Sequence, residues 1–301
     1  MNVERDYPLA RLTTVRAGGS AELFARPASE AELVEVLAWA ASEGHGVEVV
    51  GSGSNLLVAD SGVKGLVLKL DGEMTDLTRD GAQVLCGGGV RLPSAAAKVA
   101  RWGLAGLEFG INIPGTVGGA VRMNANANGG ELAAVLEWVN VCGAGGVERR
   151  TPNELGFSYR HSNLASGEVV SLASFALAEA EPEAVKATLA KMRGMRREAQ
   201  PSGIKTFGST FKNPDDPRAQ GQSAGMLLDS VGARGLTIGG ARFSPEHANF
   251  VENTGSATTA DILSLMGEGR RLVHESHGVV LEPEVQVLGE AEWPDGWHLE
   301  T

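Results

Sequence analysis

Hydrophobic and polar residues follow helical and extended spacings in the first part of the chain. The pattern Ser29-x-x-Glu32 is typical of a helix N-terminus, because each side chain can cap backbone N–H groups. Short apolar runs at 47–50 and 65–70 predict two strands, which gives a small α/β unit over about residues 1–72. The predicted helix, 29–43, has one apolar face, formed by Leu33, Val36, Leu37, Ala40 and Ala41.

The same patterns continue through the middle and the end of the chain. Pro182 can begin a helix that carries Val185, Leu189 and Met192 on one face. The segment Gln200–Gly203 is the best candidate for a linker. Other strands are predicted at 84–86, 137–142, 168–177 and 279–288, and other helices at 92–102, 223–232 and 258–276.

These elements predict three parts. The first lobe covers residues 1–72 and the second covers 73–200, while a smaller third part covers 201–277. The terminal segment, 278–301, is expected to return to the second lobe. The fold class expected from this order is α+β.

Two glycine-rich segments are candidates for ligand binding. Residues 110–131 contain six glycines and one proline, and residues 51–60 have a similar character. Small residues let backbone N–H groups approach a flat, anionic ligand, so two such loops suggest one large cofactor held at both ends. The dinucleotide fingerprint is absent, because Leu56 occupies the place of its third glycine. A plain strand-to-turn connection remains the alternative for residues 51–53.

Composition narrows the class of protein. The chain has 301 residues, 43% of them hydrophobic, and a net charge of −11, which argues against nucleic acid as the main partner. Cys86 and Cys142 lie far apart and predict reduced core thiols in a cytoplasmic protein. His274 and His277 have no third ligand nearby, so no metal site is expected. No secretory signal and no run long enough to cross a membrane are expected.

Three polar segments can carry chemistry, although each has a simpler explanation. Arg160 follows a polar loop and could be a solvated arginine. The segment 208–214 could be a turn before a helix, and the acidic run 281–285 could lie at an exposed strand end.

Taken together, these segments resemble the UDP-N-acetylenolpyruvoylglucosamine reductase family. The matching motifs occur in the family's order, and their length makes chance a poor explanation. They are Pro8–Thr14 with Gly18-Gly19, Gly51–Leu57, Ile113–Ala120 with Met123–Ala125, Tyr159-Arg160, Gln200-Pro201, Gly208-Ser209 with Phe211–Pro214, Ser244–Phe250, and Leu281 with Glu284.

The resemblance implies a two-lobed FAD-binding domain of the vanillyl-alcohol-oxidase type and a smaller α+β substrate-binding domain. It implies non-covalent FAD, with NADPH as hydride donor and a UDP-sugar as substrate. A monomer without nucleic-acid or membrane partners is expected. The residues implied to bind the cofactor are Gly51, Ser52, Gly53, Ser54, Asn55, Leu56, Ile113, Pro114, Gly115, Thr116, Gly118, Gly119, Ala120 and Asn124.

The resemblance also assigns chemistry to individual residues. Arg160 would stabilise charge that develops on the substrate carboxylate, since a guanidinium offers paired donors. Glu284 would assist in its protonated form, and Ser209 would deliver a proton to carbon. Substrate contacts are expected from Tyr159, Lys212 and Asn213, and looser diphosphate contacts from Lys205, Arg234 and Arg242.

Two departures from the family pattern affect this interpretation. Asn126 and Asn128 stand where the family has glycine and an aromatic residue or histidine; asparagine tolerates left-handed backbone angles. The 49 positions between Arg160 and Ser209 indicate the shorter, second subgroup.

Two other functions remain open. One is an FAD-dependent oxidase of an alcohol or sugar lactone, and the other is a non-catalytic UDP-sugar-binding protein.

Overall fold

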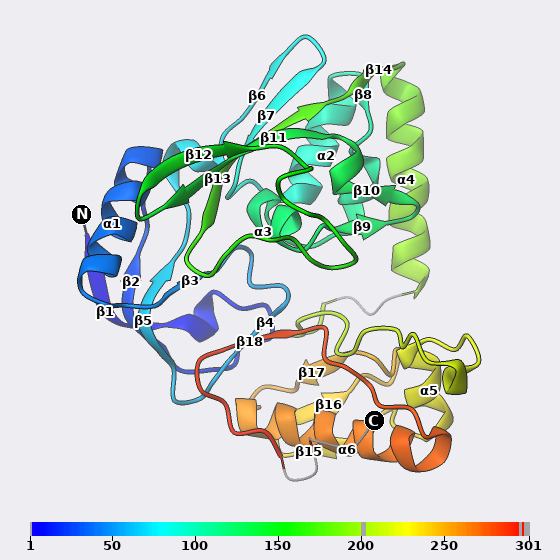
Figure 1. The fold of residues 1–301 in the computed structure, drawn as a ribbon. Helices are drawn as coiled ribbons and strands as arrows, with labels where there is room; N and C mark the ends of the chain where they lie inside the picture. Colours follow the sequence, from blue (N-terminus) through cyan, green and yellow to red (C-terminus); the bar gives the residue numbers. More distant parts are fainter. Residues whose placement is uncertain (1, 200–202, 295–296, 298–301) are drawn as a thin grey trace. The chain divides into compact units, whose positions relative to one another are not determined.

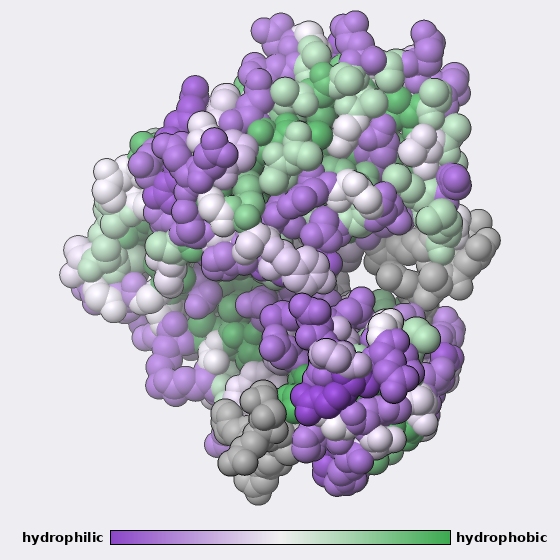
Figure 2. Space-filling view, turned by 45° about the vertical axis from the view of Figure 1, so that its right-hand side comes forward, coloured by the Kyte–Doolittle hydropathy of each residue, from purple (hydrophilic) through white to green (hydrophobic). Residues whose placement is uncertain are grey.

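The computed structural model describes residues 2–199, 203–294 and 297 of the chain (Figure 1). The chain forms two compact units, each assembled from separate segments. Unit 1 comprises Met1–Arg5, Leu23–Ser52 and Lys64–Glu198. Unit 2 comprises Asp6–Glu22, Gly53–Val63 and Ala199–Thr301. Hydrophilic residues cover much of the face shown in Figure 2, with smaller hydrophobic areas between them.

A four-stranded sheet and a helix form the first layer of unit 1. The strands β1 and β2 of this sheet continue into segments of unit 2, because the boundaries between the units fall after Arg5 and after Glu22. The strands β3 and β5 pair in parallel. The order of the sheet is β1-β2-β5-β3. Its elements are β1 (Val3–Pro8), β2 (Ser20–Ala25), β3 (Val47–Val49), β5 (Val63–Leu68) and the helix α1 (Glu30–Ser42).

The helix α1 begins as its sequence predicts. The Ser29 hydroxyl accepts a hydrogen bond from the backbone N–H of Glu32 at 3.1 Å. The Glu32 carboxylate accepts from the N–H of Ala28 at 2.8 Å instead of closing the reciprocal half of a capping box on Ser29. The predicted apolar face is buried, with Leu33, Val36, Leu37 and Ala40 in the core.

The second sheet of unit 1 is antiparallel and has the order β12-β11-β13-β7-β6. Neighbouring residues of β11 point to opposite sides: Val141 packs in the core with α2 and α3, whereas Cys142 packs in the core with α1. The elements are β6 (Leu77–Asp80), β7 (Gln83–Gly87), β11 (Leu136–Gly143), β12 (Gly146–Arg150), β13 (Val169–Ala176), α2 (Leu92–Arg101) and α3 (Val117–Arg122).

The helix α1 therefore packs against both sheets of unit 1. Its Glu30 carboxylate accepts hydrogen bonds from Asn140 of β11 at 2.9 Å and from the Ser171 hydroxyl of β13 at 2.5 Å. Most of the two predicted lobes, 1–72 and 73–200, shares this core and belongs to unit 1, whereas residues 6–22 and 53–63 of the first lobe belong to unit 2.

The helix α4 and several short elements complete unit 1. The helix α4 packs Val185 and Leu189 against α2. The remaining elements are α4 (Pro182–Ala199), β8 (Leu104–Ala105), β9 (Asn126–Ala127), β10 (Gly130–Glu131), β14 (Ala178–Glu179) and the 3-10 helices η2 (Gly72–Thr75), η3 (Glu108–Asn112) and η4 (Leu132–Ala134).

Unit 2 has its own core, formed by two helices and short strands. The helix α6 begins with a complete capping box of Thr258 and Asp261 and ends at Gly278, whose φ is +68°. The elements are α5 (Ala224–Ser230), α6 (Thr259–His277), β4 (Leu56–Val58), β15 (Thr237–Ile238), β16 (Ala241–Phe243), β17 (Val251–Asn253), β18 (Gln286–Leu288), η1 (Leu9–Arg11) and η5 (Pro217–Ala219).

The end of the chain differs from the strand predicted at 279–288. Only Gln286–Leu288 forms a regular strand, and it pairs in parallel with β4 inside unit 2 instead of joining the second lobe. Pro283 lies in the preceding segment and has no N–H to donate to a ladder, which limits regular pairing there. Of the predicted linker 200–203, residues 200–202 lie outside the described part of the chain.

Candidate functional site

The two glycine loops predicted to bind the cofactor meet inside unit 1. A Cβ atom placed on Gly51 would lie 2.6 Å from the Thr116 Oγ1 atom, so only glycine allows this approach. Thr116 caps α3, and its hydroxyl accepts from the N–H of Gly119 at 3.4 Å. The loop 51–56 passes from unit 1 to unit 2 after Ser52. Gly51, Ser52 and the segment 113–124 therefore belong to one unit.

Not all backbone groups of the second loop are open to a ligand. The N–H groups of Val117 and Gly118 donate to the carbonyls of Val90 and Gly88, both at 2.8 Å. By contrast, a Cβ atom on Gly115 would meet no atom within 4 Å, so the space beside this residue is open. Sequence reasoning treated all these glycines alike, whereas the structure divides them into packing positions and an open one.

Asn124 connects the second glycine loop with the turn that carries Arg160. Its side chain is 1% exposed, and its backbone is left-handed with φ of +39°. The Nδ2 atom donates to Glu131 Oε1 at 2.5 Å and to the Ser158 carbonyl at 3.2 Å. Within the described residues, Oδ1 has no hydrogen-bond partner. A buried acceptor of this kind is expected to receive a donor from a ligand or water.

Tyr159 and Arg160 form the tip of a tight turn. The backbones of Ser158 and His161 exchange two hydrogen bonds of 3.2 Å across it, and Arg160 has a left-handed φ of +56°. Tyr159 is 64% exposed, and the Arg160 guanidinium carbon lies 5.7 Å from its ring centre. A non-glycine residue in this conformation is held by its surroundings, which makes the arginine position specific.

The departures at Asn126 and Asn128 are accommodated by a hairpin. Asn126 pairs with Glu131 between β9 and β10. Asn128 and Gly129 form the turn with φ values of +51° and +79°, a combination favoured by an Asn-Gly pair. The tolerance expected of asparagine therefore applies at position 128.

In unit 2, the Ser209 segment lies beside the Glu284 segment. The N–H of Lys212 donates to the Glu282 carbonyl, and the N–H of Glu284 donates to the Thr210 carbonyl, both at 2.9 Å. Phe211 and Pro283 form an antiparallel bridge between these bonds. Residues seventy or more positions apart are thus brought onto neighbouring backbone segments.

Asn249 holds the other side of the Ser209 segment. Its carbonyl accepts from the N–H of Thr210 at 2.8 Å. Its side chain accepts from the N–H of Phe211 and donates to the carbonyl of Phe211, both at 2.9 Å. Ser209 itself bridges to Phe250. Sequence analysis gave Asn249 no role of its own, although an amide between Ala248 and Phe250 was a signal of a buried hydrogen-bonding position.

Asn55, which the resemblance assigns to the cofactor, also supports the acidic segment. Its side-chain Nδ2 donates to the Glu284 carbonyl at 3.2 Å, and its own carbonyl accepts from the N–H of Gln286 at 3.0 Å. The adjoining Leu56 begins β4. Asn55, a residue of the predicted cofactor loop, is therefore hydrogen-bonded directly to the backbone of Glu284.

The other residues predicted to contact the substrate differ in how many of their polar groups are already bonded within the protein. The Lys212 ammonium lies 3.1 Å from the Glu282 carboxylate, and Asn213 Oδ1 accepts from the N–H of Ala224 at 3.2 Å. The Arg234 guanidinium bonds Asp229 and two loop carbonyls, and the Arg242 guanidinium bonds Glu252 at 2.7 Å. Structural roles thus occupy most donors of Arg234, whereas the buried Nε atom of Arg242 has no hydrogen-bond partner among the described residues. Lys205 is exposed.

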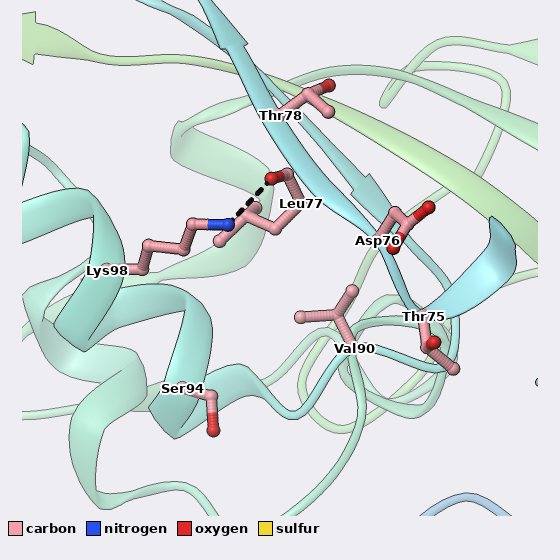
Figure 3. A pocket seen from close by; sticks show the side chains of 7 residues that line it. All are labelled: Thr75, Asp76, Leu77, Thr78, Val90, Ser94 and Lys98. Atoms are coloured by element: carbon pink, nitrogen blue, oxygen red, sulfur yellow. Dashed lines mark hydrogen bonds between the residues drawn. The ribbon is translucent and has the colours of Figure 1, made fainter. Parts of the chain in front are cut away.

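A separate cavity of about 490 Å³ lies in unit 1 between β6 and α2 (Figure 3). There the Lys98 ammonium donates to the Leu77 carbonyl at 3.0 Å and lies 5.1 Å from the Trp102 ring centre. None of the predicted site residues is among its lining residues, which are Thr75, Asp76, Leu77, Thr78, Val90, Ser94 and Lys98.

Both cysteines are core thiols, as the sequence predicts. Cys86 and Cys142 are free and buried, and burial is the main factor that raises the pKa of the thiols to about 12 and about 11. Across residues 2–199, 203–294 and 297, no group of three His, Cys, Asp or Glu side chains could hold a metal ion. In the same part of the chain, no helix is both long and apolar enough to span a membrane.

Comparison with known proteins relates both halves of the sequence to one enzyme family. Residues 200–288 match the UDP-N-acetylenolpyruvoylglucosamine reductase C-terminal domain, and residues 21–151 match an FAD binding domain. The chain is 42% identical to UDP-N-acetylenolpyruvoylglucosamine reductase 2 of Symbiobacterium thermophilum over 97% of this chain and 94% of that protein. The corresponding reductase of Novosphingobium aromaticivorans is 43% identical over 94% of both chains.

A solved structure agrees with the sequence comparisons. The crystal structure of the UDP-N-acetylenolpyruvylglucosamine reductase of Thermus caldophilus matches with a TM-score of 0.82 and 39% identity. The match covers 98% of this chain and all of that one. The α+β fold, with a two-lobed FAD-binding domain and a smaller second domain, is confirmed.

Proposed function

The chain belongs to the family of UDP-N-acetylenolpyruvoylglucosamine reductases, an FAD-dependent class of oxidoreductase, and from this membership we propose its reaction. The proposed reaction is the reduction of UDP-N-acetylglucosamine enolpyruvate to UDP-N-acetylmuramate, with NADPH as hydride donor. The structural observation that carries the proposal is the antiparallel pairing of the Ser209 segment with the Glu284 segment. It holds a proton donor and a carboxyl group on adjacent backbone segments.

The residues of unit 1 fit an FAD molecule. The open side of Gly115 permits close approach to the backbone, and the unpartnered Asn124 Oδ1 atom can accept a hydrogen bond from an N–H group of the cofactor. When bound, FAD supplies the hydride chemistry that no amino-acid side chain offers. We propose non-covalent binding by residues 51–56 and 113–124, as the family motifs indicate.

Three side chains are proposed to act on the substrate. Hydride addition to the terminal carbon of the enolpyruvyl group leaves negative charge on its carboxylate. Arg160 would stabilise that charge through paired N–H donors. Glu284 can donate a hydrogen bond there only while it carries a proton. The Ser209 hydroxyl would then transfer a proton to the carbon that bears the ether oxygen.

The remaining proposed contacts concern binding. We propose that Tyr159, Lys212 and Asn213 contact the substrate. Arg234 is a weaker candidate for its diphosphate, because Asp229 and two loop carbonyls already occupy most of its donors. Arg242, whose guanidinium bonds Glu252 through Nη2, remains a candidate. We expect a cytoplasmic monomer.

Anaerobic flavin absorbance tests the proposed function. NADPH should bleach the flavin of the purified protein, and the enolpyruvyl sugar should restore the oxidised spectrum at a comparable rate. An FAD-dependent oxidase would instead be reoxidised rapidly by oxygen and not by the sugar. A non-catalytic sugar-binding protein would bind the sugar without either change. Either of these results would refute the proposal.

A further inference from the structure

Three cationic side chains gather in unit 1 where the two glycine loops meet. Lys69 is the central one, and its ammonium donates to the Gly51 carbonyl at 2.7 Å. Its backbone N–H donates to the Ala25 carbonyl at 3.1 Å, which places the adjoining Arg26 at the same end of the sheet. We call Arg26, Lys69 and Arg91 the cationic cluster.

Arg91 reaches this place from the other loop. It forms an antiparallel bridge with Thr116, and the next residue, Leu92, donates its N–H to the Gly115 carbonyl at 3.0 Å. Thr116 is the residue that closely approaches Gly51. The members of the cationic cluster are therefore anchored to both loops, at Gly51 through Lys69 and at Gly115–Thr116 through Arg91.

The electrostatics of Lys69 show that the charges of Arg26 and Arg91 both act on its ammonium. Partial burial is the main factor that lowers the pKa of the Lys69 ammonium, and the charges of Arg26 and Arg91 lower it further. The Asp71 carboxylate opposes this effect, but one of its oxygens already caps the N–H of Gly72 at 2.9 Å. Like charges held together raise the free energy of the folded protein unless an anion lies between them.

We propose that Arg26, Lys69 and Arg91 form a binding site for the diphosphate of FAD. A diphosphate is a multivalent anion, and guanidinium and ammonium groups are its usual partners. Open loop backbone beside Gly115 lies next to the cluster, so charge and backbone donors can act on the same phosphate groups. The inference rests on the proposed function only in taking FAD as the cofactor of this site.

The test compares FAD with riboflavin, which carries neither the diphosphate nor the adenosine of FAD. Flavin-free, full-length protein is titrated with FAD and with riboflavin, and flavin fluorescence gives each dissociation constant. Lys69→Met keeps the length of the side chain but removes its charge. We expect it to weaken FAD about 10-fold or more, the size of one charge-assisted contact, while riboflavin affinity stays unchanged.

Control variants distinguish a loss of phosphate binding from a loss of structural support for the glycine loop at Gly51. Lys191→Met removes an exposed lysine of α4 and should leave both affinities unchanged. Arg26→Gln and Arg91→Gln should lower the FAD-to-riboflavin affinity ratio without removing the Lys69–Gly51 bond. They also keep the test decisive if Lys69→Met fails to fold.

The affinity ratio decides the outcome. A ratio that falls in the cluster variants, with a weaker dependence of FAD affinity on salt, supports the proposal. A ratio that stays at the wild-type value overturns it, even if both affinities fall, because the cluster would then only support the loop. Failure of the wild-type protein to reduce the enolpyruvyl sugar would refute the proposed function and leave this measurement unaffected.

Discussion

Replacement of Asn249 by alanine should affect both the stability of unit 2 and the chemistry assigned to Ser209. The Asn249 side chain makes two 2.9 Å hydrogen bonds with the backbone of Phe211, one to its N–H and one to its carbonyl. Asn249 is 5% exposed and Phe211 is fully buried, so water has little access to replace those bonds.

The expected loss of stability follows from these two backbone groups. A buried donor or acceptor left without a partner costs about 1–3 kcal/mol. The loss of a partner for these two groups of Phe211 should lower the free energy of unfolding of Asn249→Ala by about 2–6 kcal/mol. The backbone bond from Thr210 to the Asn249 carbonyl remains, so the segment should stay folded.

Asn253 provides a matched control in the same unit. It is also a buried asparagine, and its Oδ1 atom accepts from the N–H groups of Gly255 at 2.8 Å and Ala257 at 3.0 Å. Its Nδ2 atom donates to the Val15 carbonyl at 2.9 Å. Asn253→Ala should lose a comparable amount of stability, but its side chain makes none of the bonds that hold Phe211.

Urea denaturation and stopped-flow flavin absorbance measure the two effects. We expect both variants to be destabilised and to be reduced by NADPH at the wild-type rate. Only Asn249→Ala should be reoxidised more slowly by the sugar, by about 10-fold or more, because a small displacement of a reacting group is costly. The reasoning would be wrong if the two variants slowed that step equally, or if Asn249→Ala left it unchanged.

Other predictions concern the proposed catalytic residues and the thiols. Ser209→Ala should accept hydride from NADPH normally but be reoxidised by the sugar about 10²–10⁴-fold more slowly, and normal reoxidation would remove Ser209 from the chemistry. Arg160→Lys should lower turnover by about 10²-fold with unchanged flavin content, whereas Arg149→Lys should retain it. The folded-state pKa values of Cys86 and Cys142, about 12 and about 11, exceed the value near 8.5 of an unfolded thiol. The unfolded chain therefore releases protons first, so the stability from each thiol is lost as pH rises from about 8.5 toward its folded-state pKa, by at most about 1.4 kcal/mol per pH unit. Urea titrations between pH 7 and 10 on wild type and a double Cys→Ala variant should show this difference, and parallel curves would contradict it.

Local sequence signals predicted the longer helices well, but not the six-residue helix α3 within the second glycine loop. Ser29 caps α1 and Thr258 begins α6 with its capping box, and these contacts involve residues within three positions. The last strand was predicted too long because its pairing partner, β4, lies far away in the sequence and Pro283 interrupts the segment. The core that the two lobes share beneath α1 was also not evident from the sequence, because it depends on contacts with β11 and β13.

The candidate site, too, could be predicted from the sequence only in part. Family motifs indicated Arg160, Ser209 and Glu284, but they did not indicate what holds them. Asn249 and Asn55 hold the two adjacent segments through amide groups whose partners are remote in the sequence, up to 229 positions for the bond from Asn55 to Glu284. Hydrophobic periodicity carries no information about such bonds, since an amide looks the same in a turn and in a buried network.

The parallel pairing of β18 with β4 has a consequence for synthesis of the protein. The chain enters and leaves unit 2 repeatedly, and Gln286–Leu288 is made long after its partner β4. Until it leaves the ribosome, the edge of β4 that later pairs with β18 lacks this partner, and an unpaired edge can associate with other chains. The segments of unit 2 that are made first must therefore wait for β18. We expect truncation before residue 286 to lower the soluble yield far more than loss of the last five residues.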